Sequence, residues 1–128
     1  KEAESMLQGI NRLDELTTVL KKAAEGMQFH EAIISFYEED GKLGSRSNNE
    51  ESSIGEKVSW KDPNFSGYYS RKNEFVAEFP ISGRKYSYGK ILYRFIDNRD
   101  KLEVNEEVLL ERIHDGLSVF AAKVRKQS

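Results

Sequence analysis

The sequence predicts an α+β fold, in which an antiparallel sheet of about five strands carries the N- and C-terminal helices on one face. The strongest observation is a β-hairpin over residues 74–96: apolar side chains alternate along its first strand, Ser82-Gly83-Arg84 supplies a turn, and a β-rich run returns. Apolar residues at helical spacing near both ends of the chain predict the helices. Because an isolated hairpin is only marginally stable, these other elements must cover it.

The first part of the chain predicts helical structure. Residues 1–10 are a short charged stretch with apolar residues at helical spacing, and we expect an entering helix or a linker there. Asn11 is a candidate N-cap for a helix that runs to about Ala24, and Gly26 is a candidate C-cap. The apolar residues of this helix form one stripe that would face a sheet or a partner helix: Leu13, Leu16, Leu20, Ala23 and Met27.

Three further strands are expected before the hairpin. Residues 31–38 are apolar and β-branched, and the Asp40-Gly41 pair that follows is typical of a tight hairpin turn. The returning strand, residues 42–47, contains a glycine and only one apolar side chain, so we place it at a sheet edge. Residues 56–60 alternate as a third strand, and a loop leads from there to the hairpin.

A long C-terminal helix is predicted from Asn105, a candidate N-cap, to about Lys126. At about 1.5 Å per residue a helix of about 21 residues is about 31 Å long, whereas strands of about six residues span only about 20 Å. The overhanging apolar positions need the first helix, residues 1–10 or a second copy of the chain to cover them. We therefore expect a homodimer formed through the terminal helices. Its interface would use Leu110, Ile113, Leu117, Phe120 and Val124.

The composition of the chain limits the classes of function that it can have. The 128 residues suit one domain over residues 11–128. The net charge of −2 comes from interspersed acids and bases, which argues against a nucleic-acid surface. The absence of cysteine excludes thiol chemistry and thiolate metal sites. No apolar run approaches the roughly 20 residues that span a bilayer, so we expect no membrane insertion of this segment. Since the chain does not begin with methionine, we expect it to be a segment of a larger protein.

Several phrases resemble the GAF domain family. Leu13-Asp-Glu-Leu16 and residues 32–41 resemble its opening helix and first hairpin. Residues 79–84 with Gly89-Lys-Ile-Leu-Tyr93 resemble its late hairpin, and Val104-Asn-Glu-Glu107 resembles the start of its final helix. The likeness covers about residues 11–124. It implies a regulatory or interaction domain of a larger protein, in a family whose ligand-binding members hold the ligand on the sheet face opposite the terminal helices.

The chain also departs from that family. Its middle segment, residues 48–73, is short, it lacks the signature of cyclic-nucleotide-binding members, and no cysteine can attach a bilin. We expect no cofactor and a small pocket or none. Residues 16–29 and 91–94 are more weakly similar to the GAF-like extension of some undecaprenyl-phosphate N-acetylglucosamine 1-phosphate transferases. This likeness implies a cytoplasmic appendage, tethered through a membrane-embedded parent whose catalytic and magnesium-binding aspartates would lie outside this chain.

Two functions stay open on sequence grounds: a regulatory module that works through its helical face, and a small-molecule sensor. For the sensor, aromatic and basic side chains would line a shallow site for an anionic or ring-bearing ligand, although we favour a purely structural plug of the sheet face. These residues are Trp60, Phe65, Tyr68, Tyr69, Arg71 and Phe75. His30 and His114 are the only histidines, and we expect structural roles for both and no metal site. A free-standing enzyme has the least support, since no nucleophile–base pair, metal cluster or phosphate loop is present in the sequence.

Overall fold

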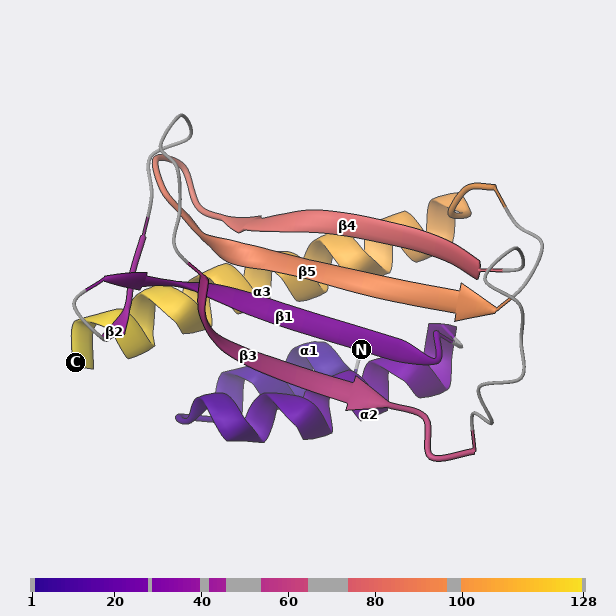
Figure 1. Ribbon diagram of the computed structural model, residues 1–128, viewed down its shortest axis with the longest axis horizontal. Coiled ribbons are helices and arrows are strands. Elements are labelled where there is room, and N and C mark those ends of the chain that lie inside the picture. The colour runs from indigo at the N-terminus through magenta and orange to yellow at the C-terminus, as the bar shows by residue number, and fades with distance from the viewer. Residues whose placement is uncertain are drawn as a thin grey trace.

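The computed structural model describes residues 2–27, 29–39, 42–45, 54–64, 74–96 and 100–127. In chain order, its elements are α1 (Glu2–Gly9), the short 3₁₀ helix η1 (Leu13–Glu15), α2 (Leu16–Met27), β1 (Glu31–Glu39), β2 (Lys42–Leu43), β3 (Ile54–Lys61), β4 (Glu74–Ser82), β5 (Ser87–Ile96) and α3 (Val104–Gln127). The predicted α+β class is confirmed: Figure 1 shows the sheet as one layer and the three α-helices as a second layer behind it.

The strands form one antiparallel sheet of five in the described part of the chain, with β1 in its interior. β1 pairs with β5 on one side and with β3 on the other, so that Ile34 lies opposite both Ile91 and Val58. β4 pairs with β5 and closes one edge, which confirms the hairpin expected over residues 74–96. The two-residue β2 pairs only with the end of β1.

Alternation along the strands sends one set of side chains toward the helices, where they form the core. These residues are Ala32, Ile34 and Phe36 of β1, Val58 of β3, Ala77 and Ile81 of β4, and Ile91, Tyr93 and Phe95 of β5. The apolar stripe expected for the first helix meets them, since Leu16, Leu20, Ala23 and Met27 of α2 are buried and Leu13 packs against the same cluster. The opposite face of the sheet carries no helix of the described chain.

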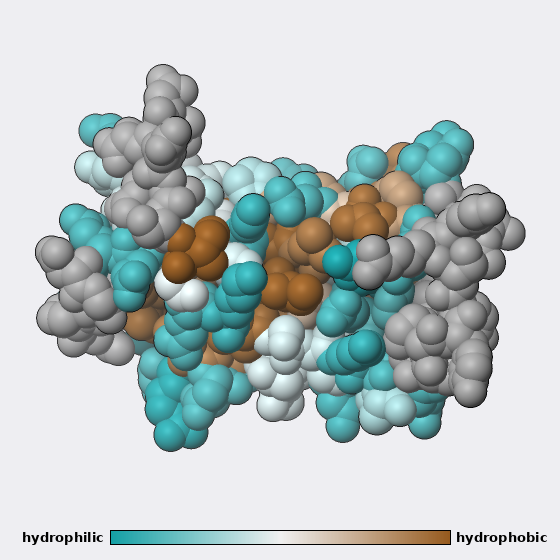
Figure 2. Space-filling model, viewed as in Figure 1, coloured by the Kyte–Doolittle hydropathy of each residue, from teal (hydrophilic) through white to brown (hydrophobic). Residues whose placement is uncertain are grey.

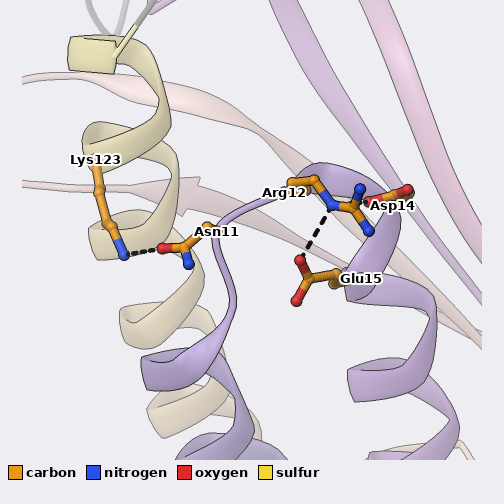
Figure 3. A network of polar contacts seen from close by, with 5 residues as sticks. All are labelled: Asn11, Arg12, Asp14, Glu15 and Lys123. Carbon is orange, nitrogen blue, oxygen red and sulfur yellow. Dashed lines mark hydrogen bonds and ion pairs between the residues drawn. The ribbon is translucent and has the colours of Figure 1, made fainter.

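α1 belongs to the same core, because Ala3, Leu7 and the following Ile10 are buried in it. Gly116 lets α1 approach α3 closely: a Cβ atom at this position would lie 2.9 Å from Cδ1 of Leu7. Asn11, which follows α1, is not the N-cap expected from the sequence. Its Oδ1 accepts a 2.7 Å hydrogen bond from Nζ of Lys123, which ties the α1–α2 connection to α3 (Figure 3).

The short 3₁₀ helix η1 directly precedes α2 and leads the chain into it. Arg12 precedes η1, and its Nε lies 3.4 Å from Oδ1 of Asp14 and 3.3 Å from Oε1 of Glu15 (Figure 3). At the other end, Gly26 lies inside α2, which continues to Met27. The expected C-cap is therefore one or two residues early.

The start of α3 also differs slightly from the expectation. The helix begins at Val104, so Asn105 lies within its first turn. The backbone N–H of Glu103 donates a 3.0 Å hydrogen bond to Oε1 of Glu106, which is one half of a capping box and fixes the helix start.

The last helix does not overhang the sheet as expected, because the strands are longer than the sequence suggested. α3 has 24 residues, or about 36 Å, while β5 has 10 residues and spans about 33 Å. The strand is longer than the six residues assumed from the sequence, so one helix and one strand nearly match. The expected turn at Asp40-Gly41 lies outside the described residues. No helix in the described ranges is long and apolar enough to cross a membrane.

Candidate functional site

The residues expected at a dimer interface lie inside the monomer. Leu110, Ile113, Leu117 and Phe120 are each at most 3% exposed, and Val124 packs partly buried against the same core. Their side chains face the sheet and the other helices, so this apolar stripe is already covered within one chain. The helix periodicity identified this apolar stripe, and within the described chain the sheet and the other helices cover it.

α3 presents a different set of residues to the outside. Val104, Val108 and Val119 are 77%, 45% and 70% exposed. Arg112 and Asp115 are also exposed and lie between the last two valines. The spacings of four, four, three and four residues place all five on one side of the helix, opposite the buried stripe. We call Val104, Val108, Arg112, Asp115 and Val119 the outward stripe of α3.

A groove runs beside this stripe, between α3 and α1. Its volume is about 310 Å³. The close approach of the two helices at Gly116 forms its floor. The α3 side of the groove includes Arg112, Asp115 and Val119, and the α1 side consists of Glu4, Leu7 and Gln8. The groove therefore widens the outward stripe into a surface formed by both terminal helices.

A larger cavity lies at the C-terminal end of α2, where β1 begins and β3 ends. Its volume is about 480 Å³. α2 contributes polar side chains and the segment around β1 and β3 contributes rings. The lining residues are Lys21, Ala24, Glu25, Phe29, His30, Trp60, Asp62, Pro63 and Asn64. Among them the sequence suggested a ligand-binding role only for Trp60 and a structural role for His30, because nothing in the spacing of the chain indicates that the end of α2 meets the end of β3.

The aromatic residues expected to bind a ligand are only partly described. Phe65, Tyr68, Tyr69 and Arg71 lie outside the described residues. Trp60 and Phe75 are described, and both occupy strand positions on the helix-covered side, opposite Ala32 and Phe95 respectively. This corrects their expected location on the uncovered sheet face.

Trp60 and Phe75 are the two ends of a continuous row of rings. The ring centroid of Trp60 lies 5.9 Å from that of Phe29, that of Phe29 lies 6.1 Å from that of Phe95, and that of Phe95 lies 5.9 Å from that of Phe75. The Phe29 contacts are edge-to-face, a geometry that aromatic pairs prefer. Both residues therefore contribute to the core, and Trp60 in addition lines the cavity.

An ionic network joins the ends of β1, β4 and β5. The Nε atom of Arg94 lies 3.0 Å from Oε1 of Glu31, and its Nη1 atom lies 3.4 Å from Oε2 of Glu74. Nε2 of His30 lies 3.5 Å from the other carboxylate oxygen of Glu74. Burial lowers the pKa of His30, while the carboxylates of Glu74 and Glu31 oppose this shift without cancelling it. The imidazole is therefore neutral at pH 7.

His114 belongs to a second buried group, between α3 and the sheet. Its Nε2 atom lies 2.9 Å from the Tyr93 hydroxyl, and its ring packs 4.8 Å from that of Phe79. Burial lowers the pKa of His114 to about 4 and raises that of Tyr93. We therefore assign the hydroxyl as donor and neutral Nε2 as acceptor. The surroundings of His30 and of His114 agree with the structural roles expected for them.

The uncovered face of the sheet carries an apolar band within a hydrophilic border. Figure 2 shows brown side chains across the middle of this face, with teal side chains around them. Val76 and Ile54 are 43% and 40% exposed there, and Ile33 and Leu92 are half-buried. In the described ranges no group of three His, Cys, Asp or Glu could hold a metal ion.

Comparisons with known proteins identify no family for this chain. No protein-family model matches the chain, and no curated protein sequence is significantly similar to it. Among solved structures it is similar to a far-red cyanobacteriochrome photoreceptor, whose crystal structure was determined at room temperature. The TM-score is 0.48 and the sequence identity 16%, over 85% of each chain. This likeness is too distant to carry a function across.

Proposed function

We propose that this chain is a non-catalytic regulatory domain of a longer protein, and that it self-associates through the outward stripe of α3. The observation that carries this proposal is the stripe itself, which exposes valines around a pair of opposite charges on a helix whose core face is fully covered. The sequence resemblance to GAF domains supports the regulatory class. Buried, structural environments for both histidines favour a non-catalytic role.

The stripe is self-complementary in one orientation. In an antiparallel pair of α3 helices, related by a twofold axis between residues 113 and 114, Val108 of each copy faces Val119 of the other. The same axis places Arg112 opposite Asp115. A symmetric pair thus contains each contact twice. A parallel pair would instead place Arg112 against Arg112 and Asp115 against Asp115, and like charges directly opposite one another are destabilising.

Charge reversal tests this geometry sharply. Arg112→Asp leaves two acidic residues at the centre of the stripe, and Asp115→Arg leaves two basic ones, so each variant alone should be monomeric. Mixing the two variants restores both ion pairs and should give a heterodimer, and the double variant should recover the homodimer. Sedimentation velocity over a concentration series measures all four samples, and we expect each single reversal to weaken the dimer at least roughly tenfold.

The matched control is Arg84→Asp, which makes the same change of charge at an exposed position in the β4–β5 turn and not on α3. Its sedimentation should match that of the unaltered chain. The proposal is wrong if the unaltered chain stays monomeric at several hundred micromolar, or if the two single variants fail to pair on mixing.

The identity of the parent protein is a separate prediction. The weaker sequence resemblance favours a membrane-embedded undecaprenyl-phosphate sugar-1-phosphate transferase, with this domain on the cytoplasmic side and catalysis elsewhere in the parent. Fractionation of cells that express the full-length parent would test it, since the domain should sediment with membranes and be accessible to protease only from the cytoplasmic side.

A further inference from the structure

We propose that the cavity at the C-terminal end of α2 binds a small organic cation. This inference goes beyond the proposed self-association and does not depend on it, because the cavity is formed by α2, β1 and β3 and includes no residue of α3. Its volume of about 480 Å³ falls within the roughly 300–1,000 Å³ of small-molecule sites.

The aromatic wall is the first argument. Trp60 is half-buried and lines the cavity, and its indole is held against Phe29 in an edge-to-face contact at 5.9 Å between ring centroids. Phe29 is itself 2% exposed, so the indole packs on a fixed support. Tryptophan is the ring that attracts a cation most strongly, through the negative potential of its π face.

The charge of the lining is the second argument. Glu25 and Asp62 contribute two carboxylates, against one ammonium group from Lys21. Lys22, which is not in the lining, pairs with Glu25 at 3.1 Å. The Asp62 carboxylate has one oxygen engaged by the backbone N–H of Asn64 at 2.9 Å. The C-terminal end of α2 adds the negative end of a helix dipole. An anion would be repelled by the two carboxylates and by this end of the helix.

His30 is the third argument. It is 5% exposed and lines the cavity at the start of β1. Its ring is neutral at pH 7, so it adds a polar wall without adding positive charge that would repel a cation. Aromatic rings, carboxylates and a neutral imidazole together suit an amine or quaternary ammonium group with an apolar body.

The experiment uses choline as the probe and 3,3-dimethyl-1-butanol as its uncharged isostere. Trp60 is the only tryptophan in the chain, so its indole N–H gives a single, unambiguous peak in a ¹H–¹⁵N correlation spectrum, from a side chain that lines this cavity. We expect choline to shift this peak saturably in the millimolar range, and the isostere to bind at least about fivefold more weakly. Equal shifts with both compounds at matched ionic strength would overturn the proposal.

Variants of the two carboxylates separate charge from shape. Asp62→Asn keeps the acceptor oxygen for the Asn64 N–H and removes the charge, and Glu25→Gln is nearly isosteric. Each should weaken choline binding roughly two- to fivefold. Glu56→Gln is the matched control at the other end of β3, and it should change nothing. Choline affinity that is unaltered in both cavity variants would refute the site. The monomeric Arg112→Asp variant should bind choline normally, so failure of one proposal does not imply failure of the other.

Discussion

At Gly89 the backbone of β5 lies so close to that of β1 that no side chain fits between them. A Cβ atom there would lie 2.1 Å from the carbonyl oxygen of Ser35 and 3.0 Å from Cα of Phe36, and neither backbone atom can move without breaking the β1–β5 ladder. We predict that Gly89→Ala lowers the free energy of unfolding by more than about 2 kcal/mol. Urea denaturation measures this directly.

Gly83, in the β4–β5 turn, is the natural control for this substitution, because a Cβ atom there would meet nothing within 4 Å. Gly83→Ala should therefore change the free energy of unfolding by no more than about 0.5 kcal/mol. Similar losses for both variants would show that glycine flexibility, and not close contact, matters at Gly89. Two features of the structure distinguish Gly89 from Gly83: its positive φ of 159° and the register that places it against β1.

At the scale of elements, His114 and Tyr93 join α3 to the sheet in a way that depends on pH. The folded pKa of His114 is about 4, against an ordinary value of 6.5, so the unfolded chain binds a proton more readily than the folded one. The contribution of neutral His114 to the free energy of unfolding is therefore fully present above pH 6.5 and is lost as the pH falls toward 4. The loss attributable to this residue is about 3 kcal/mol.

His114→Gln keeps a polar group near the Tyr93 hydroxyl but cannot titrate in this range. The variant should show a smaller decrease in the free energy of unfolding between pH 7 and pH 4 than the unaltered chain, although it is less stable at pH 7 because the ring contact with Phe79 is lost. Guanidinium denaturation at several pH values gives the slope. An identical slope in both proteins would contradict the assigned pKa.

Elements also show how far the sequence determines this fold. Period-two alternation predicted the β4–β5 hairpin, and helical spacing predicted the buried faces of α2 and α3, because burial on one face requires these patterns. What covers those faces was not predictable. The stripe from Leu110 to Val124 gives the same signal whether a sheet or a second copy packs on it, and the lengths of the strands decide between them.

For the whole molecule, the candidate sites depend on contacts between distant parts of the chain. Trp60 belonged to the set of aromatic and basic residues that the sequence suggested for a ligand site, but its cavity arises only where the end of α2 meets the end of β3. The outward stripe of α3 was present in the spacing of Val108 and Val119, yet the more hydrophobic stripe on the opposite side of the helix masked it. Periodicity ranks faces by hydrophobicity, and in this helix the more hydrophobic face is used inside the monomer.

The proposed self-association through α3 predicts a consequence for the stability of the whole molecule. Because α3 packs along the sheet and contacts α1, unfolding of one chain must also separate the dimer, so the dimer is linked to folding by mass action. A hundredfold rise in protein concentration should then raise the melting temperature by about 5 °C. The monomeric Arg112→Asp variant should melt at the same temperature at every concentration. Calorimetry at about 5 and 500 μM distinguishes the two cases. If the melting temperature of the unaltered chain is the same at both concentrations, the outward stripe of α3 does not mediate self-association.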